Sequence, residues 1–116
     1  MTEENVIRYH SSSELSLASD SILFEKQAFR IEEGRICAPA SATVTEVATF
    51  LAALGLEPGD ILAMSPSLAT PCRLIRFDTH GTIFVIEERM PELTALMRQL
   101  QFESAVHKQG YAVERI

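Results

Sequence analysis

Apolar and polar residues alternate with period two at residues 21–25 and again at residues 28–32. Such alternation is typical of a strand with one buried face and one solvated face. A further strand is expected at Arg35–Ala38, after the turn at Glu33 and Gly34, and a short one at Asn5–Tyr9. The first third of the chain is therefore predicted to form a small antiparallel meander.

The pattern changes to a helical period over residues 44–54. Thr43 and Glu46 have the spacing of a capping box, in which the hydroxyl accepts from the N3 amide and the carboxylate accepts from the cap amide. Gly55 can adopt the left-handed conformation that ends a helix, and Leu56 can then fold back in a Schellman motif. The apolar stripe between these signals consists of Val44, Val47, Ala48, Leu51 and Leu54.

The second half of the chain predicts three more strands and a second helix. A strand at Ile61–Met64 precedes a loop at residues 65–71, which holds two prolines. Residues 72–77 and 82–87 are predicted to pair as a hairpin across the connection Asp78-Thr79-His80-Gly81.

A helix is expected to begin near Pro91 and to end before Gly110, with a last strand at residues 111–116. The apolar stripe of this helix is Leu93, Leu96, Met97 and Leu100.

This order predicts a single α+β domain over residues 1–116, in which residues 1–20 allow an irregular N-terminal segment. We expect a mostly antiparallel sheet of about five to six strands with the two helices packed chiefly on one face. From residue 28 onward, the order can also be drawn as a ferredoxin-like βαββαβ unit with one extra strand.

One predicted strand differs from the others, because residues 83–86 (Ile-Phe-Val-Ile) are apolar on both faces. A strand of this kind is typical of a central position covered on both sides, or of an interface.

The charge of the chain narrows the classes of function. Sixteen acidic residues against ten basic ones give a formal net charge of −6, whereas a general nucleic-acid binder needs a basic surface. The first residues are acidic and no apolar run is long enough for a signal peptide or a membrane span. We expect a soluble cytoplasmic protein whose two cysteines are reduced.

No catalytic residue, metal site or cofactor is predicted, and the question of enzymatic activity stays open, with a non-enzymatic role favoured. Cys72 precedes a strand, where nothing lowers the pKa of a thiol, so packing is the favoured role. Cys37 and Cys72 are too far apart for a zinc motif. Glu103 and His107 have helical i, i+4 spacing, but a solvated pair is the favoured interpretation. If the chain binds a small molecule, the candidate ligand-binding residues are Cys72, Arg76 and His80, beside the predicted hairpin.

A short stretch resembles the AbrB/SpoVT-type swapped-hairpin transcription factors. The matching residues are Gly34-Arg35-Ile36, Pro39 and residues 54–62, Leu-Gly-Leu-Glu-Pro-Gly-Asp-Ile-Leu. In that family a strand ending in proline leads through a helix and a turn into another strand, and two chains interleave into a DNA-binding dimer. The segment between Pro39 and Leu54 is longer here and lacks the basic residues expected after the proline.

The leading functional hypothesis is a non-enzymatic interaction or regulatory module that forms a homodimer. One alternative is a small-molecule-binding domain or small enzyme, with a pocket near Cys72, Arg76 and His80. The other is the DNA-binding regulator that the resemblance implies.

Overall fold

The computed structural model describes residues 5–10, 21–32, 34–104 and 110–116. The first half of the chain contains β1 (Asn5–Tyr9), β2 (Ser21–Phe24), β3 (Gln27–Glu32), β4 (Arg35–Ala38), α1 (Val44–Ala53) and β5 (Ile61–Met64). Two short 3-10 turns, η1 (Pro58–Asp60) and η2 (Pro66–Leu68), flank β5. The second half contains β6 (Pro71–Phe77), β7 (Ile83–Pro91), α2 (Glu92–Ser104) and β8 (Gly110–Arg115).

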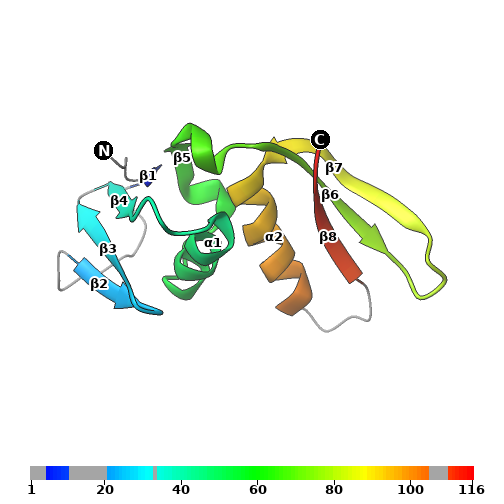
Figure 1. Cartoon of the computed structure of the whole chain (residues 1–116). Helices are drawn as coiled ribbons and strands as arrows, with labels where there is room; N and C mark the ends of the chain where they lie inside the picture. Colours follow the sequence, from blue (N-terminus) through cyan, green and yellow to red (C-terminus); the bar gives the residue numbers. More distant parts are fainter. Residues whose placement is uncertain (1–4, 11–20, 33, 105–109) are drawn as a thin grey trace.

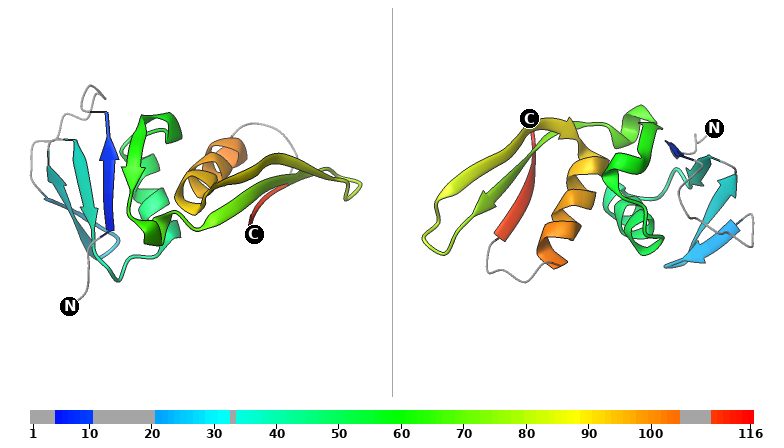
Figure 2. Two further views of the ribbon diagram at one scale, coloured as in Figure 1. Left: turned by 90° about the horizontal axis from the view of Figure 1, so that it is seen from above. Right: turned by 180° about the vertical axis from the view of Figure 1, so that it is seen from behind.

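The strands of the described residues form two antiparallel sheets. The N-terminal sheet has the order β2-β3-β4-β1-β5, and the C-terminal sheet has the order β7-β6-β8. Both helices lie between the two sheets, with α1 beside the N-terminal sheet and α2 beside the C-terminal one (Figure 1). The view from above shows the same layers (Figure 2).

Helix α1 begins and ends at the residues that the sequence signals predict. The Thr43 hydroxyl accepts from the Glu46 amide at 3.1 Å, and a Glu46 carboxylate oxygen accepts from the Thr43 amide at 3.0 Å. Gly55 has a φ of 82°. The Leu56 amide donates to Leu51 O at 3.0 Å, which is the long hydrogen bond of a Schellman motif. The capping box and the stop signal are both confirmed.

The main core fills the space between the N-terminal sheet and the two helices. Its buried side chains include Ile7, Phe29 and Ile36 from the sheet, and Phe50 and Leu51 from α1. Burying side chains of this size stabilises a fold by roughly 1.5–3 kcal/mol each before entropy is subtracted.

Helix α2 is apolar on two sides, and this explains its central position. Leu93 and Met97 belong to the main core, together with α1. Ala95 and Phe102 belong to a second, smaller core with Cys72 and other residues of the C-terminal sheet. A helix that buries two faces can separate two sheets, each of which covers one of those faces.

The predicted α+β class and the antiparallel pairing are confirmed, but the strands are divided between two sheets instead of forming one. The ferredoxin-like topology is wrong for the same reason, because it needs a single sheet. Residues 65–70 carry the chain from β5 in one sheet to β6 in the other. No local signal in the sequence records this change of sheet.

Two element boundaries also differ from the prediction. Strand β7 continues to Pro91, well beyond the expected end at residue 87, and α2 begins one residue later. Helix α2 ends at Ser104, and residues 105–109, where the prediction extended it, lie outside the described residues. The predicted irregular segment is described only in part, and β1 occupies residues 5–9 of it.

Candidate functional site

The β6–β7 hairpin is the most exposed apolar part of the described chain. It extends away from α2, so that its turn lies at the far end of the molecule from β2 and β3 (Figure 2). Asp78 organises the turn, since its Oδ1 accepts from the amides of His80 and Thr82 at 2.9 and 3.0 Å. Gly81 has a φ of 80°, which favours glycine at this position. The hairpin is therefore confirmed, but its connection is one residue longer than predicted, because β6 ends at Phe77 and β7 begins only at Ile83.

Strand β7 is longer than the strand it pairs with. Between the pairs Cys72–Met90 and Leu74–Glu87, β7 contains one residue more than β6, and the same occurs before the pair Ile75–Val85. These are β-bulges, which bend a strand and are frequent at sheet edges. From Val85 to the turn, the two strands pair residue for residue.

Because directly paired residues share a face of the sheet, the register defines two faces for the hairpin. The face away from α2, here called the outer face, carries Ile75, Phe77, Ile83 and Val85. Phe84 lies on the opposite face, where the guanidinium carbon of Arg76 is 4.8 Å from the centroid of its ring. That distance is within the range of a cation–π contact.

The four consecutive apolar residues of β7 are all exposed. The exposed fractions are 64% for Ile83, 41% for Phe84, 49% for Val85 and 37% for Ile86. Strand β7 is at the edge of its sheet, so the expectation of a central strand covered on both sides is wrong. The other role that the sequence suggested for this segment, an interface, stays a prediction.

The three candidate ligand-binding residues lie at different points along the hairpin. Cys72 is fully buried near the start of β6, Arg76 is half-buried near its end, and His80 is exposed in the turn. The guanidinium of Arg76 contacts the ring of Phe84. Neither of the two pockets described for this structure is lined by any of the three. A ligand site formed by these residues stays a prediction.

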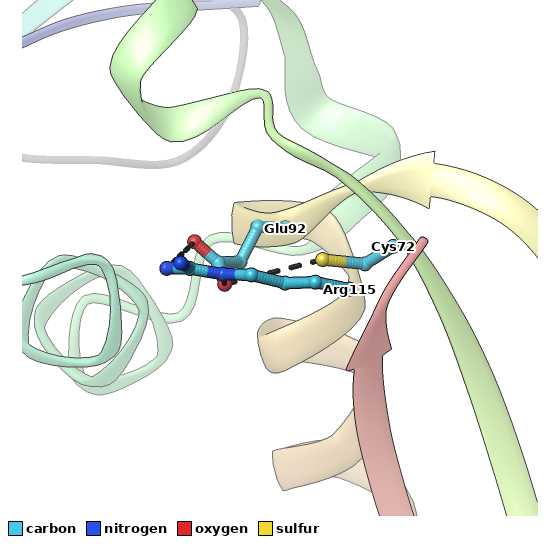
Figure 3. A network of polar contacts seen from close by, with 3 residues as sticks. All are labelled: Cys72, Glu92 and Arg115. Atoms are coloured by element: carbon cyan, nitrogen blue, oxygen red, sulfur yellow. Dashed lines mark hydrogen bonds and ion pairs between the residues drawn. The ribbon is translucent and has the colours of Figure 1, made fainter.

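Cys72 belongs to a polar cluster that the sequence did not predict. Its Sγ lies 3.9 Å from Oε2 of Glu92, the first residue of α2, and Arg115 Nε lies 3.0 Å from the same oxygen. Figure 3 shows the three side chains converging from β6, α2 and β8. Glu92 also benefits from the positive end of the helix dipole.

The cluster does not activate the thiol. Burial raises the pKa of Cys72, and the Glu92 charge raises it further, while Arg115 opposes both. A nucleophilic cysteine needs the opposite shift. The favoured packing role of Cys72 agrees with this arrangement, since Cys72 and Leu74 share the smaller core.

Two other predictions are not tested by the structure. Glu103 is exposed on α2, but His107 lies outside the described residues. In the segment that resembles the AbrB/SpoVT type, β4 and β5 both pair with β1 of the same chain. Binding to DNA stays a prediction.

Comparison with models of known protein families, with curated proteins and with solved structures finds no significant match to this chain. In the part of the chain that the structure describes, neither helix has the length and apolar character needed to cross a membrane. Only the exposed surfaces and pockets of this molecule therefore indicate what it binds.

Proposed function

We propose that this chain is a non-enzymatic interaction module that works as a homodimer, in which a second copy covers β7. The observation that supports this proposal is the run Ile83-Phe84-Val85-Ile86 on an edge strand, each side chain exposed by more than a third. An edge strand presents unpaired backbone groups, and a long apolar one invites pairing with another chain.

The exposed apolar area fits a dimer interface of ordinary size. Together with Phe77, which is 38% exposed, these side chains present on the order of 400 Å² of apolar surface, at roughly 200 Å² for a whole large side chain. A standard interface buries about 800 Å² per partner, of which somewhat more than half is apolar. The exposed apolar area of the hairpin is therefore about as large as the apolar part of such an interface.

A second copy suits this edge because the apolar run can pair with itself. In an antiparallel pair centred on Phe84, Ile83 lies opposite Val85 of the partner subunit. The centre falls within the segment that pairs regularly with β6, and the bulge at Ile86 limits its length. A twofold contact of this kind is closed and produces a dimer, not a fibre.

Light scattering coupled to size-exclusion chromatography tests the proposal. The wild-type chain at about 50 µM, a concentration suited to micromolar affinity, is expected to elute at twice the monomer mass. Val85→Lys places a charge in the proposed interface and is expected to give a monomer. Leu62→Lys is the matched control, since Leu62 is 60% exposed on β5 in the other sheet.

The proposal is overturned if the wild-type chain is monomeric at that concentration, or if Val85→Lys and Leu62→Lys have the same mass as the wild type. Phe84→Cys tests the register separately. Directly opposed residues of antiparallel strands are about 4.5–5.5 Å apart between Cα atoms, which suits a disulfide. Mild oxidation is then expected to link two copies of Phe84→Cys, and to leave Leu62→Cys unlinked.

A further inference from the structure

A pocket of about 550 Å³ opens where β1, the start of α1 and the end of β8 meet. This volume is within the range of sites for small molecules, roughly 300–1,000 Å³. Its lining includes the polar residues Asn5, Ser67 and Arg115. None of its described lining residues belongs to β7, so the pocket is separate from the proposed dimer interface.

Asn5 gives the pocket a hydrogen-bond donor. The residue is only 8% exposed, and its Oδ1 accepts from the hydroxyl of Ser67. Among the described residues, none accepts a hydrogen bond from its Nδ2. An acceptor atom of a ligand in the pocket would give this amide a hydrogen-bond partner.

Arg115 is the basic residue among the described residues that line the pocket. The guanidinium makes a two-point contact with Glu92, in which Nε lies 3.0 Å from Oε2 and Nη2 lies 3.4 Å from Oε1. A guanidinium has five N–H donors, so the pairing with Glu92 leaves others for a ligand. None of the described residues that line the pocket is acidic, although the chain as a whole has a net charge of −6.

The N-terminus of α1 adds to the positive electrostatic potential in the pocket. Thr43 and Val44 line the pocket, and the first amides of a helix lack partners within the helix and point outward. The helix dipole places a partial positive charge there. The Thr43 amide is used by Glu46, so this contribution supports the other two donors and does not replace them.

We propose that this pocket binds a small ligand carrying an oxyanion, either a carboxylate or a phosphate group. Arg115 pairs with the anion, and Asn5 Nδ2 donates to a second oxygen of the ligand. The bound molecule would contact both β1 and β8, and thereby join the first and last strands of the described chain.

The test is an NMR titration of the full-length chain at constant ionic strength, with inorganic phosphate in one arm and succinate in the other. Saturable shifts are expected for the backbone amides of Asn5, Ser67 and Arg115 in at least one arm, at millimolar affinity. The arm that saturates identifies the anion. Because the ionic strength is constant, changes in electrostatic screening cannot cause the shifts, and saturable shifts then report binding.

Three variants test the assignment. Arg115→Gln is expected to weaken binding at least about tenfold, equivalent to 1.4 kcal/mol, while Arg115→Lys retains part of the affinity. Asn5→Asp keeps the acceptor for Ser67 and places a carboxylate in the pocket, so binding is lost. Arg73→Gln is the matched control, because Arg73 also pairs with a glutamate across strands, with Nε 2.9 Å from Glu114 Oε1, but does not line the pocket.

The proposal is overturned if neither anion causes saturable shifts up to about 10 mM, far above a millimolar dissociation constant. It is also overturned if Arg115→Gln and Arg73→Gln bind equally well. Should Asn5→Asp fail to fold, the comparison between the two arginine variants still decides, because both arginines have largely exposed side chains.

Discussion

The ring of Phe29 on β3 lies flat against the ring of Phe50 on α1, with centroids 3.9 Å apart and planes 6° apart. Both side chains are almost completely buried. Phe24 contacts Phe50 edge-on, with a centroid distance of 5.4 Å. These rings join β2 and β3 to α1.

Replacing Phe50 with alanine is expected to lower the free energy of unfolding by about 3–5 kcal/mol, because it removes the stacked ring and leaves a cavity. Urea unfolding followed by circular dichroism measures the loss. Leu62→Ala is the matched control, since Leu62 is 60% exposed on β5, and its effect should stay within about 1 kcal/mol. Similar losses for the two variants would contradict a core role for Phe50.

The turn between β2 and β3 holds two residues in a conformation that favours glycine or asparagine. Glu25 has a φ of 48° and Lys26 a φ of 70°, and Phe24 pairs with Gln27 on either side of them. This is the geometry of a two-residue type I′ hairpin, for which Asn-Gly is the preferred sequence. Replacing Glu25-Lys26 with Asn-Gly is expected to stabilise the chain by about 1 kcal/mol.

A thermal melt checks that expectation, and a rise of about 4 °C in Tm corresponds to such a gain. Glu57→Gly serves as the control, because Glu57 has a φ of −103°. There glycine relieves no strain and only adds entropy to the unfolded chain, so the Tm should fall. Equal and negative shifts at both sites would show that the turn is unstrained.

The helices and strands are largely predictable from the sequence, because their signals are local. Thr43, Glu46 and Gly55 fix the ends of α1 by contacts within a few residues. The hairpin turn depends in the same way on Asp78 and Gly81. The assignment of strands to two sheets is not local, because it depends on which faces of α2 find partners.

In the candidate site, too, the local features are predictable from the sequence and the non-local ones are not. The apolar run at residues 83–86 is visible in the sequence, but its exposure follows from the edge position of β7 and the reach of the hairpin beyond α2. The contact of Glu92 with Arg115 joins residues that are 23 positions apart. No spacing rule connects a helix start to the end of the last strand, so this pair could not be predicted.

The environment of Cys72 predicts a loss of stability at alkaline pH. Burial and Glu92 raise the pKa of the folded thiol above its ordinary value of about 8.5. Above that pH, the unfolded chain ionises Cys72 while the folded chain keeps it protonated, so unfolding is favoured as the pH rises. The stability that the protonated Cys72 thiol contributes is fully present below the thiol pKa of the unfolded chain. It is lost as the pH rises through the thiol pKa of the folded chain.

Denaturant titrations from about pH 7 to about pH 10, a range that spans the ordinary thiol pKa, measure this effect. Cys72→Ala removes the titrating group, so its stability should decline less over the same range. Thiol labelling gives a second measure: Cys72 should react slowly in the native state and fast in urea. A thiol that reacts rapidly at neutral pH in the folded chain would contradict this assignment.

Gly110 lies beneath the ring of Phe77, its partner across β8 and β6. A Cβ atom at Gly110 would come within 2.0 Å of Phe77 Cε2, so Gly110→Ala must displace the ring. Phe77 is 38% exposed and can move, which limits the loss. In a Phe77→Ala background, Gly110→Ala is expected to stabilise by about 0.5–1 kcal/mol, because alanine is less flexible in a strand. In the wild-type background that gain should disappear or change sign.

A double-mutant cycle measured by urea unfolding gives the coupling energy between Gly110 and Phe77 directly. Equal effects of Gly110→Ala in the two backgrounds would show that the ring does not cover the glycine.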